Sequence, residues 1–411
     1  MKEFNYIDLF AGAGGLSEGF IRAGFKPVAH VEMNKEACDT IKTRTAYHWL
    51  KANKKIKIYN DYLKSETKNK EELWRSVPEC VINSVLNKEI SENTLPGIFK
   101  TIDNQLYGKK VDLIIGGPPC QAYSIAGRAR KDMDSDPRNH LYKHYVKFLV
   151  KYKPKMFVFE NVPGILSAKN GDYLNKIFKA VRSAGYEVEI PPNNHLNAKD
   201  FGVLQDRKRV IIIGWKKELN LKYPKFETIE CNFQILKDLF SDLKPLKNGQ
   251  GTFNAIEYTK PTTDYLKQSN IRNGLDFVTQ HIVRPNNDND LEIYQIAIDQ
   301  WNNGKRLKYA ELPKRLIKHS NTDSFVNRFQ VVNGKGISHT VVAHIAMDGH
   351  YYIHPDKKQN RSISVREAAR IQSFPDDYFF EGSRTSAFKQ IGNAVPPLMA
   401  QKIAEKIRRM I

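Results

Sequence analysis

The chain alternates between short apolar runs and longer segments whose apolar residues recur at helical spacing. Segments of strand length are predicted at 5–11, 27–32, 56–61, 111–115, 156–162, 187–194 and 209–215. Most of 111–115 and most of 156–162 are apolar, whereas 56–61 alternates apolar and polar residues. The segments near 35–50, before Tyr152 and at 170–183 predict helices between these strands. Strands that alternate with helices predict an α/β fold, in which one largely buried sheet carries helices on its faces.

Two stretches depart from this alternation. Residues 64–110 are polar, with apolar residues at near-helical spacing, and predict a helical elaboration between the third and fourth strands. From about 216 to 335, Lys, Asn, Asp and Thr become frequent, long periodic helices disappear and turn dipeptides recur, which predicts an irregular second domain. We therefore expect a first domain of residues 1–214, completed by 386–411, and a second domain of residues 215–385.

The charge of the chain narrows the classes of partner. Among 411 residues, 65 Lys and Arg against 45 Asp and Glu give a net charge of +20. Such a surplus of positive charge favours a polyanionic partner, most simply nucleic acid. The alternative is a soluble protein that is basic without such a partner. No signal peptide and no apolar run of membrane-spanning length is present, so we expect a cytoplasmic protein without a membrane partner.

The cysteines and histidines do not indicate a metal site. The four cysteines lie far apart and form no CxxC pair, which argues against a zinc ribbon or a disulfide framework. His339, His344, His350 and His354 match no metal-ligand spacing. We therefore expect no metal.

A cysteine follows the fourth predicted strand. The sequence Gly-Gly-Pro-Pro at 116–119 breaks that strand, which places Cys120 on a loop just past its carboxyl end. Ligands bind at this edge of open α/β sheets, so Cys120 is a candidate nucleophile; a buried structural thiol is the alternative. Arg128 begins a basic segment, 128–131. Its side chains are candidates for binding phosphates, and the alternative is a loop that is only solvated.

A glycine-rich turn follows the first predicted strand. Gly12, Gly14 and Gly15 let the backbone approach a ligand closely, in the strand–turn–helix order of a nucleotide-binding unit. Ser17 stands where a dinucleotide fingerprint requires glycine, which weakens the pyrophosphate interpretation. A plain tight turn is the alternative.

Acids end three of the predicted strands. Glu32 ends the second strand and is placed to accept hydrogen bonds from ribose hydroxyls, unless it is only a helix N-terminal acid beside a cap at Asn34. Asp61 ends the third and is a candidate for a nucleobase amine. Glu160 and Asn161 close the otherwise apolar fifth strand. A polar pair at the end of such a strand indicates a functional site more often than a chance arrangement.

A third polar set precedes the last strand. Gln205, Arg207 and Arg209 alternate, so an extended backbone places their long side chains on one face. Two guanidinium groups on that face suit carbonyl or phosphate oxygens.

Taken in order from residue 5 to residue 400, these features resemble the DNA (cytosine-5) methyltransferases. The matching segments are Asp8-Leu9-Phe10 with Gly12, Gly14 and Gly15; Gly117-Pro118-Pro119-Cys120-Gln121; Glu160-Asn161-Val162; Gln205, Arg207 and Arg209; Arg366-Glu367-Ala368-Ala369-Arg370-Ile371-Gln372; and Gly392-Asn393-Ala394-Val395. Six matches in order, with a variable region between the fourth and the fifth, are very specific. Tyr123 stands where the family usually has Phe, a conservative departure.

The resemblance implies a fold, a cofactor and a set of contacts. The fold is a Rossmann-like S-adenosylmethionine-dependent methyltransferase domain with a mixed seven-stranded sheet, followed by a smaller target-recognition domain. The implied cofactor residues are Phe10 at the adenine, Glu32 at the ribose, Asp61 at the adenine amine, and Gly12, Gly14, Gly15, Pro118, Asn393 and Ala394. The implied DNA contacts are Pro119, Gln121, Ser124, Arg128, Asn161 and Gln205.

The implied activity is methyl transfer from S-adenosylmethionine to C5 of a cytosine flipped out of a specific duplex sequence. Cys120 would bond to C6 of the ring, and Glu160 would contact N3 and the exocyclic amine. Arg207 and Arg209 would favour the thiolate. We expect a monomer that acts on double-stranded DNA, in a restriction–modification setting with a cognate restriction endonuclease as a further partner.

Two rival functions are open on sequence grounds. A tRNA-modifying cytosine-5 methyltransferase shares these motifs, but the Cys-Phe-Thr tripeptide of that branch is absent and the candidate recognition region is long. A non-enzymatic DNA-binding relative, or a nicotinamide-binding Rossmann protein, is the second rival. The joint presence of Cys120 and Glu160 argues against an inactive relative, and Ser17 argues against a dinucleotide.

Overall fold

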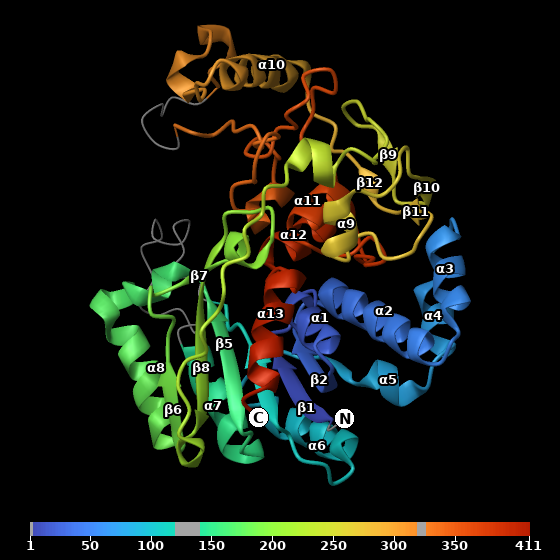
Figure 1. The fold of residues 1–411 in the computed structure, drawn as a ribbon. Helices are drawn as coiled ribbons and strands as arrows, with labels where there is room; N and C mark the ends of the chain where they lie inside the picture. Colours follow the sequence, from blue (N-terminus) through green and yellow to red (C-terminus); the bar gives the residue numbers. More distant parts are fainter. Residues whose placement is uncertain (1–2, 120–139, 319–325) are drawn as a thin grey trace.

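A computed structural model, described for residues 3–119, 140–318 and 326–411, shows a lower lobe built on one sheet and an upper lobe of shorter elements (Figure 1). The sheet has the order β3-β2-β1-β4-β5-β8-β6, with β7 beside β8. Its strands are β1 (Phe4–Leu9), β2 (Phe25–Glu32), β3 (Val85–Asn87), β4 (Leu113–Gly116), β5 (Met156–Asn161), β6 (Tyr186–Glu189), β7 (Leu196–Asn197) and β8 (Lys208–Lys216). The first five strands pair in parallel, whereas β8 runs antiparallel to both β5 and β6. This confirms the predicted α/β fold with a mixed seven-stranded sheet.

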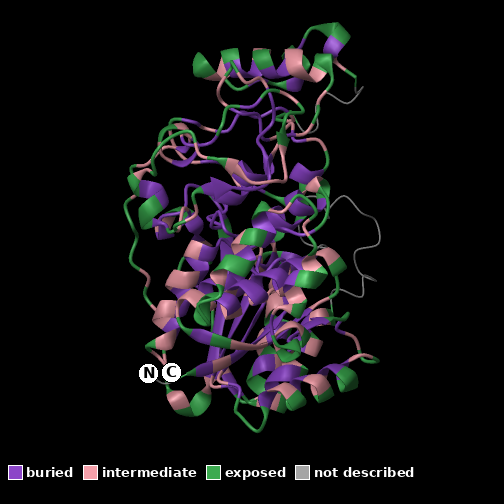
Figure 2. Ribbon diagram, turned by 90° about the vertical axis from the view of Figure 1, so that its right-hand side faces the viewer, coloured by how far each residue is buried: buried purple, intermediate pink, exposed green. Residues whose placement is uncertain are grey.

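Helices cover both faces of the sheet, which is why the central strands β4 and β5 carry apolar residues at successive positions. Successive strand residues point to opposite faces: Ile114 packs into one core and Ile115 into the other. The covering helices are α6 (Leu95–Leu106), α7 (Leu141–Tyr152) and α8 (Asp172–Ser183) on one face, and α1 (Gly15–Arg22) and α13 (Pro397–Arg408) on the other. Figure 2 shows the strands as the buried centre of the lower lobe. In the described ranges, no helix is long and apolar enough to cross a membrane.

Helix α13 packs directly against α1, although the two lie at opposite ends of the chain (Figure 1). A glycine permits this close approach: a Cβ added at Gly19 would lie 2.4 Å from the Cβ of Ala400 and from the backbone nitrogen of Gln401. The guanidinium of Arg408 donates a hydrogen bond to the carbonyl of Ala23 at the end of α1. Residues close to the C-terminus therefore complete the core beneath β1.

Replacing Gly19 by alanine is expected to lower the free energy of unfolding by about 1–3 kcal/mol, because the added methyl group overpacks the contact with α13. Denaturant titration measures the change. Gly97→Ala in α6 is the matched control, since a Cβ there meets no atom within 4 Å. That variant should gain about 0.5–1 kcal/mol from helix propensity. Equal effects of the two substitutions would contradict the packing argument.

The prediction of a third strand at residues 56–61 is wrong. Residues 56–61 lie in helix α3 (Ile56–Lys64), because Tyr59, Tyr62 and Leu63 form an apolar face that packs into a shared core with Phe277 and Phe379. The strand beside β2 is instead β3, inside the segment predicted to be a helical elaboration. That segment is otherwise helical, as expected, with α4 (Lys70–Arg75), α5 (Glu79–Asn83) and α6.

The upper lobe, residues 235–393, is built mostly from short elements around a main core, which Ala13 and Leu204 of the lower lobe join. Its strands and helices are β9 (Gly251–Thr252), β10 (Ile256–Glu257), α9 (Asp264–Gln268), β11 (Phe277–Val278), β12 (His281–Ile282), α10 (Asp288–Asn302), α11 (Val365–Ile371) and α12 (Arg384–Asn393). The expected absence of long helices from residues 216–335 is wrong, since α10 has 15 residues. Asn287 caps this helix, and its buried face anchors a small outer core.

Buried arginines of α11 hold the upper lobe together. Arg370 pairs with Asp242 at 2.6 Å and with Asp376 at 2.7 Å, and all three side chains are fully buried. Arg366 donates to the backbone carbonyls of Pro375 and Tyr378, in the turn that follows α11. Burial of charge is costly unless it is paired in this way, so these contacts fix the turn relative to α11.

Candidate active site

The loop after β1 reverses direction through left-handed backbone conformations. Phe10, Gly12 and Gly14 have φ values of 55°, 56° and 76°. Only glycine adopts such values without strain, so the half-buried Phe10 at the loop's start is a strained residue of the kind that clusters at binding sites. Gly14 then serves as the N-cap of α1. The predicted strand–turn–helix unit is confirmed.

The carboxylate of Glu32 closes this loop. Its Oε2 accepts a hydrogen bond from the backbone nitrogen of Gly12 at 2.9 Å, and its Oε1 accepts one from Asn34 at 2.8 Å. Burial raises the pKa of Glu32, and these hydrogen bonds offset the rise only in part. Each carboxylate oxygen retains acceptor capacity, and a Cβ added at Gly12 would meet no atom within 4 Å. Open space beside an acceptor fits a ligand that presents hydroxyl groups.

The C-terminal motif returns to the same loop. A Cβ added at Gly15 would lie 2.4 Å from the carbonyl oxygen of Val395 and 3.1 Å from the Cβ of Ala394. Asn393, the last residue of α12, is exposed. The structure thus brings together the Gly-rich loop and the 393–395 turn, as the resemblance implied.

Asp61 does not join this group. It lies on α3, not at the end of a strand, and its exposed carboxylate pairs with Lys57 at 2.6 Å one helical turn away. The reason for assigning it to a nucleobase amine was its position at a strand end, and the structure removes that reason.

The ends of β4 and β5 bring the second group of predicted residues together. The two strands are parallel neighbours, with Gly116 opposite Phe159. A Cβ added at Gly117 would lie 2.7 Å from Oε2 of Glu160, and the amide of Asn161 donates to the carbonyl of Pro118 at 3.2 Å. Glu160 and Asn161 therefore contact the backbone just before Pro119. The predicted residues Cys120, Gln121, Ser124 and Arg128 lie outside the described residues.

Arg209 holds the carboxylate of Glu160. Its Nε lies 2.8 Å from Oε1 of Glu160, and the two side chains are only 10% and 15% exposed. Burial lowers the pKa of Arg209, and the charge of Glu160 opposes that change. Strands β5 and β8 set the pair, since Glu160 lies opposite Ile211 in the antiparallel ladder. A charged hydrogen bond between largely buried groups orients the carboxylate and leaves Oε2 beside Gly117.

Gln205 and Arg207 lie deeper and bind backbone groups. Arg207 is fully buried, and its guanidinium donates to the carbonyls of Val341, Gly392 and Ala394. Gln205 accepts from the backbone nitrogen of Val341 and donates to the carbonyl of Ile371. These contacts tie the start of β8 to α12 and to the upper lobe. The geometry gives Arg207 an evident structural role, and its catalytic role stays a prediction.

Sequence reasoning missed a buried network behind the Gly-rich loop. Glu18, in the first turn of α1, pairs with Arg44 of α2 (Lys35–Ala52) at 2.7 Å, and Arg44 pairs with Asp377 at 2.8 Å. Burial raises the pKa of Glu18, but the charges of Arg44, His48 and Arg22 outweigh it and hold the pKa well below its usual value. The sequence signal that could have revealed this network is the position of Glu18 between the apolar residues Leu16 and Phe20 of a short helix.

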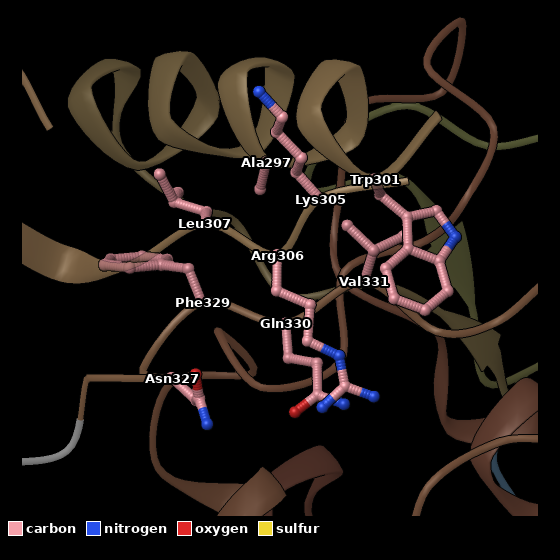
Figure 3. A pocket seen from close by; sticks show the side chains of 9 residues that line it. All are labelled: Ala297, Trp301, Lys305, Arg306, Leu307, Asn327, Phe329, Gln330 and Val331. Atoms are coloured by element: carbon pink, nitrogen blue, oxygen red, sulfur yellow. The ribbon is translucent and has the colours of Figure 1, made fainter. Parts of the chain in front are cut away.

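The upper lobe carries a pocket between α10 and the segment 327–331 (Figure 3). Lys305, Arg306 and Asn327 at its rim are exposed, whereas Gln330 is buried. The guanidinium of Arg306 lies 5.9 Å from the ring centroid of Trp301. The exposed cations Lys305 and Arg306 give the rim of this pocket groups that suit phosphates.

Comparisons with known proteins cover almost the whole chain. The model of the C-5 cytosine-specific DNA methylase family matches residues 4–78 and 82–409. The Type II methyltransferase M.Bpa9945I of Bacillus paralicheniformis is 44% identical and is covered, like this chain, over 98% of its length. The Type II methyltransferase M.DdeI of Desulfomicrobium norvegicum is 33% identical, over 98% of this chain and 88% of the relative.

Solved structures with a similar fold are also methyltransferases. A crystal structure of a prophage-encoded E. coli protein, named as a DNA modification methyltransferase, superposes with a TM-score of 0.63 at 25% identity, over 99% of both chains. The Entamoeba histolytica methyltransferase EhMeth superposes with a TM-score of 0.56 at 15% identity, over 100% of this chain and 99% of that one, and shows the fold alone. With the family model matched from β1 to α13, the chain belongs to the C-5 cytosine-specific DNA methylases, and it is an enzyme of that family.

Proposed function

We propose that this enzyme transfers a methyl group from S-adenosylmethionine to C5 of a cytosine flipped out of a specific DNA duplex, through a covalent bond between Cys120 and C6. The observation that supports it best is the Glu160–Arg209 pair, which holds a carboxylate against Gly117, three residues before Cys120. An oriented acid, held at a backbone position three residues before a candidate nucleophile, supports covalent activation of a ring.

The residues around the Gly-rich loop fit the cofactor. Phe10 offers an aromatic face, Glu32 offers acceptor oxygens to hydroxyl groups, and the open side of Gly12 leaves room for the ligand. Pro118 follows β4, the strand paired with β1, and Asn393 precedes Ala394 and Val395, which pack against Gly15 of this loop. When bound, S-adenosylmethionine supplies an electrophilic methyl group on a sulfonium.

The chain's own residues activate the cytosine. The Cys120 thiolate forms a bond to C6, and the electron pair of the C5–C6 double bond becomes the nucleophile at C5, while Glu160 donates a hydrogen bond or a proton at N3 as charge builds on the ring. After C5 takes the methyl group, loss of the C5 proton to solvent, expulsion of the thiolate and return of any proton on N3 to Glu160 restore the aromatic base. A thiol with a pKa of about 8.5 is only partly ionised at neutral pH, so we assign to Arg207 and Arg209 the positive charge that favours the thiolate.

C6 is inaccessible inside a duplex, so the base must leave the stack, which costs a few kcal/mol. The net charge of +20 favours binding to the phosphate backbone, and we assign to that binding the free energy that offsets this cost. We place part of the DNA contact in the upper lobe, where the exposed Lys305 and Arg306 lie at the rim of the pocket of Figure 3.

Incubation with methyl-labelled S-adenosylmethionine tests the proposal. Label is expected to enter duplex DNA and not tRNA, and bisulfite sequencing of the product should show one protected sequence context. Label that enters only tRNA would overturn the DNA assignment, and label in adenine would overturn the chemistry. The Type II names of the relatives also support a restriction–modification setting, for which a nuclease that cuts the same sequence is the test.

A further inference from the structure

A tyrosine of the upper lobe holds the Gly-rich loop from behind. The hydroxyl of Tyr378, in the turn between α11 and α12, donates a hydrogen bond to the carbonyl of Ala13. The two groups are buried, with Tyr378 at 1% and Ala13 at 2% exposure. A Cβ added at Gly14 would lie 2.9 Å from the same hydroxyl. The contact thus fixes the peptide that joins Ala13 to Gly14, where the chain takes its left-handed turn into α1.

Neighbouring contacts keep Tyr378 in place. Arg44 lies 4.8 Å from the centroid of its ring and pairs with both Asp377 and Glu18, so one guanidinium joins the turn to the first helical turn of α1. Arg366 of α11 donates to the backbone carbonyl of Tyr378. The ring edge of Phe374 would lie 3.1 Å from a Cβ added at Gly15. The 374–378 turn therefore packs against the Gly-rich loop at Ala13, Gly14 and Gly15.

We propose that Tyr378 is a positioning residue for the cofactor, acting through the Ala13 carbonyl, an inference that rests on the proposed S-adenosylmethionine site. Without the hydroxyl, the buried carbonyl loses its partner, and the loop populates conformations that do not bind. The apparent affinity then falls in proportion to the population of the binding conformation. The chemistry at Cys120 and Glu160 does not depend on this contact once the cofactor is bound.

Tyr378→Phe tests the proposal, with Tyr265→Phe as the matched control. Tyr265 is also buried in the upper-lobe core and donates its hydroxyl to a backbone carbonyl, that of Gly202, at 3.0 Å. Calorimetric titration with S-adenosylhomocysteine and initial rates on duplex DNA give the two readouts. We expect Tyr378→Phe to raise Kd and the cofactor KM about tenfold with kcat changed less than about twofold. Tyr265→Phe should lower Tm similarly without changing Kd.

The outcomes separate this inference from the function on which it rests. A wild-type protein that binds no S-adenosylhomocysteine would refute the proposed function and this inference together. Wild-type binding with an unchanged Kd in Tyr378→Phe, or an equal rise in Tyr265→Phe, would refute the inference alone. Asp377→Asn weakens the ion pair between Arg44 and this turn and should also raise Kd. It is the variant to measure if Tyr378→Phe does not fold.

Discussion

Cys120→Ala is expected to abolish methyl transfer, with kcat reduced by about 10⁴-fold or more, while cofactor and DNA binding persist. The reason is chemical: C5 of cytosine is a weak nucleophile until a bond at C6 makes it electron-rich, and alanine cannot form that bond. Label transfer measures the rate, and a mobility shift with duplex DNA measures binding. Cys80→Ala, which removes an exposed free thiol, is the control and should keep full activity.

A trapped adduct gives an independent readout. A duplex in which 5-fluorocytosine replaces the target base has no C5 proton to lose, so the bond between Cys120 and C6 should persist. A denaturing gel should then show a protein–DNA band with the wild type and with Cys80→Ala, and none with Cys120→Ala. Substantial transfer by Cys120→Ala, or a band that survives the substitution, would refute the assignment of the nucleophile.

Glu160→Gln is expected to lower kcat by about 10²–10³-fold, the usual cost of removing one oriented stabilising group. Glutamine has nearly the shape of glutamate and can hydrogen bond, but it cannot deliver a proton to N3. The substitution also leaves the guanidinium of Arg209 without its charge partner at 10% exposure, so Tm should fall as well.

A double-mutant cycle separates the two consequences. Arg209→Met should lower Tm and, by releasing the Glu160 carboxylate, lower kcat in part. The combined variant should lose less stability than the sum of the single variants, because neither charge is then left alone. Glu92→Gln, which alters an exposed pair with Lys147, is the control and should change neither rate nor Tm. A kcat of Glu160→Gln within about twofold of the wild type would refute the role at N3.

The successes of sequence reasoning follow from local physics. Strands β1, β2, β4 and β5 were predictable because both of their faces are buried, which forces a run of apolar residues. The carboxyl ends of parallel strands meet at one edge of a sheet, and this rule alone is enough to place Glu32 and Glu160 at a common edge.

The failures arise where local pattern is ambiguous or where contacts are remote. The segment at 56–61 alternates in the manner of a strand, yet Tyr59 and Tyr62 also fit a helical face, and the packing against Phe379 favours the helix. Strand β3, with three residues, is too short to be recognised. The contact of Tyr378 with Ala13 joins residues 365 positions apart, and no local pattern encodes it.

The packing of α13 on α1 has a consequence for biosynthesis. Arg408 reaches Ala23 across 385 residues. At a translation rate of about 5–20 residues per second, the face of α1 and β1 that α13 covers stays exposed on the ribosome for roughly 20–80 s. The upper lobe ends at residue 393 and shares its main core with Ala13 and Leu204 of the lower lobe, so it is completed only just before α13. During the interval the nascent sheet domain presents the apolar face of α1 to chaperones and to other nascent chains. Slowed translation of the intervening region should therefore increase aggregation of this enzyme more than it lowers the stability of the finished protein.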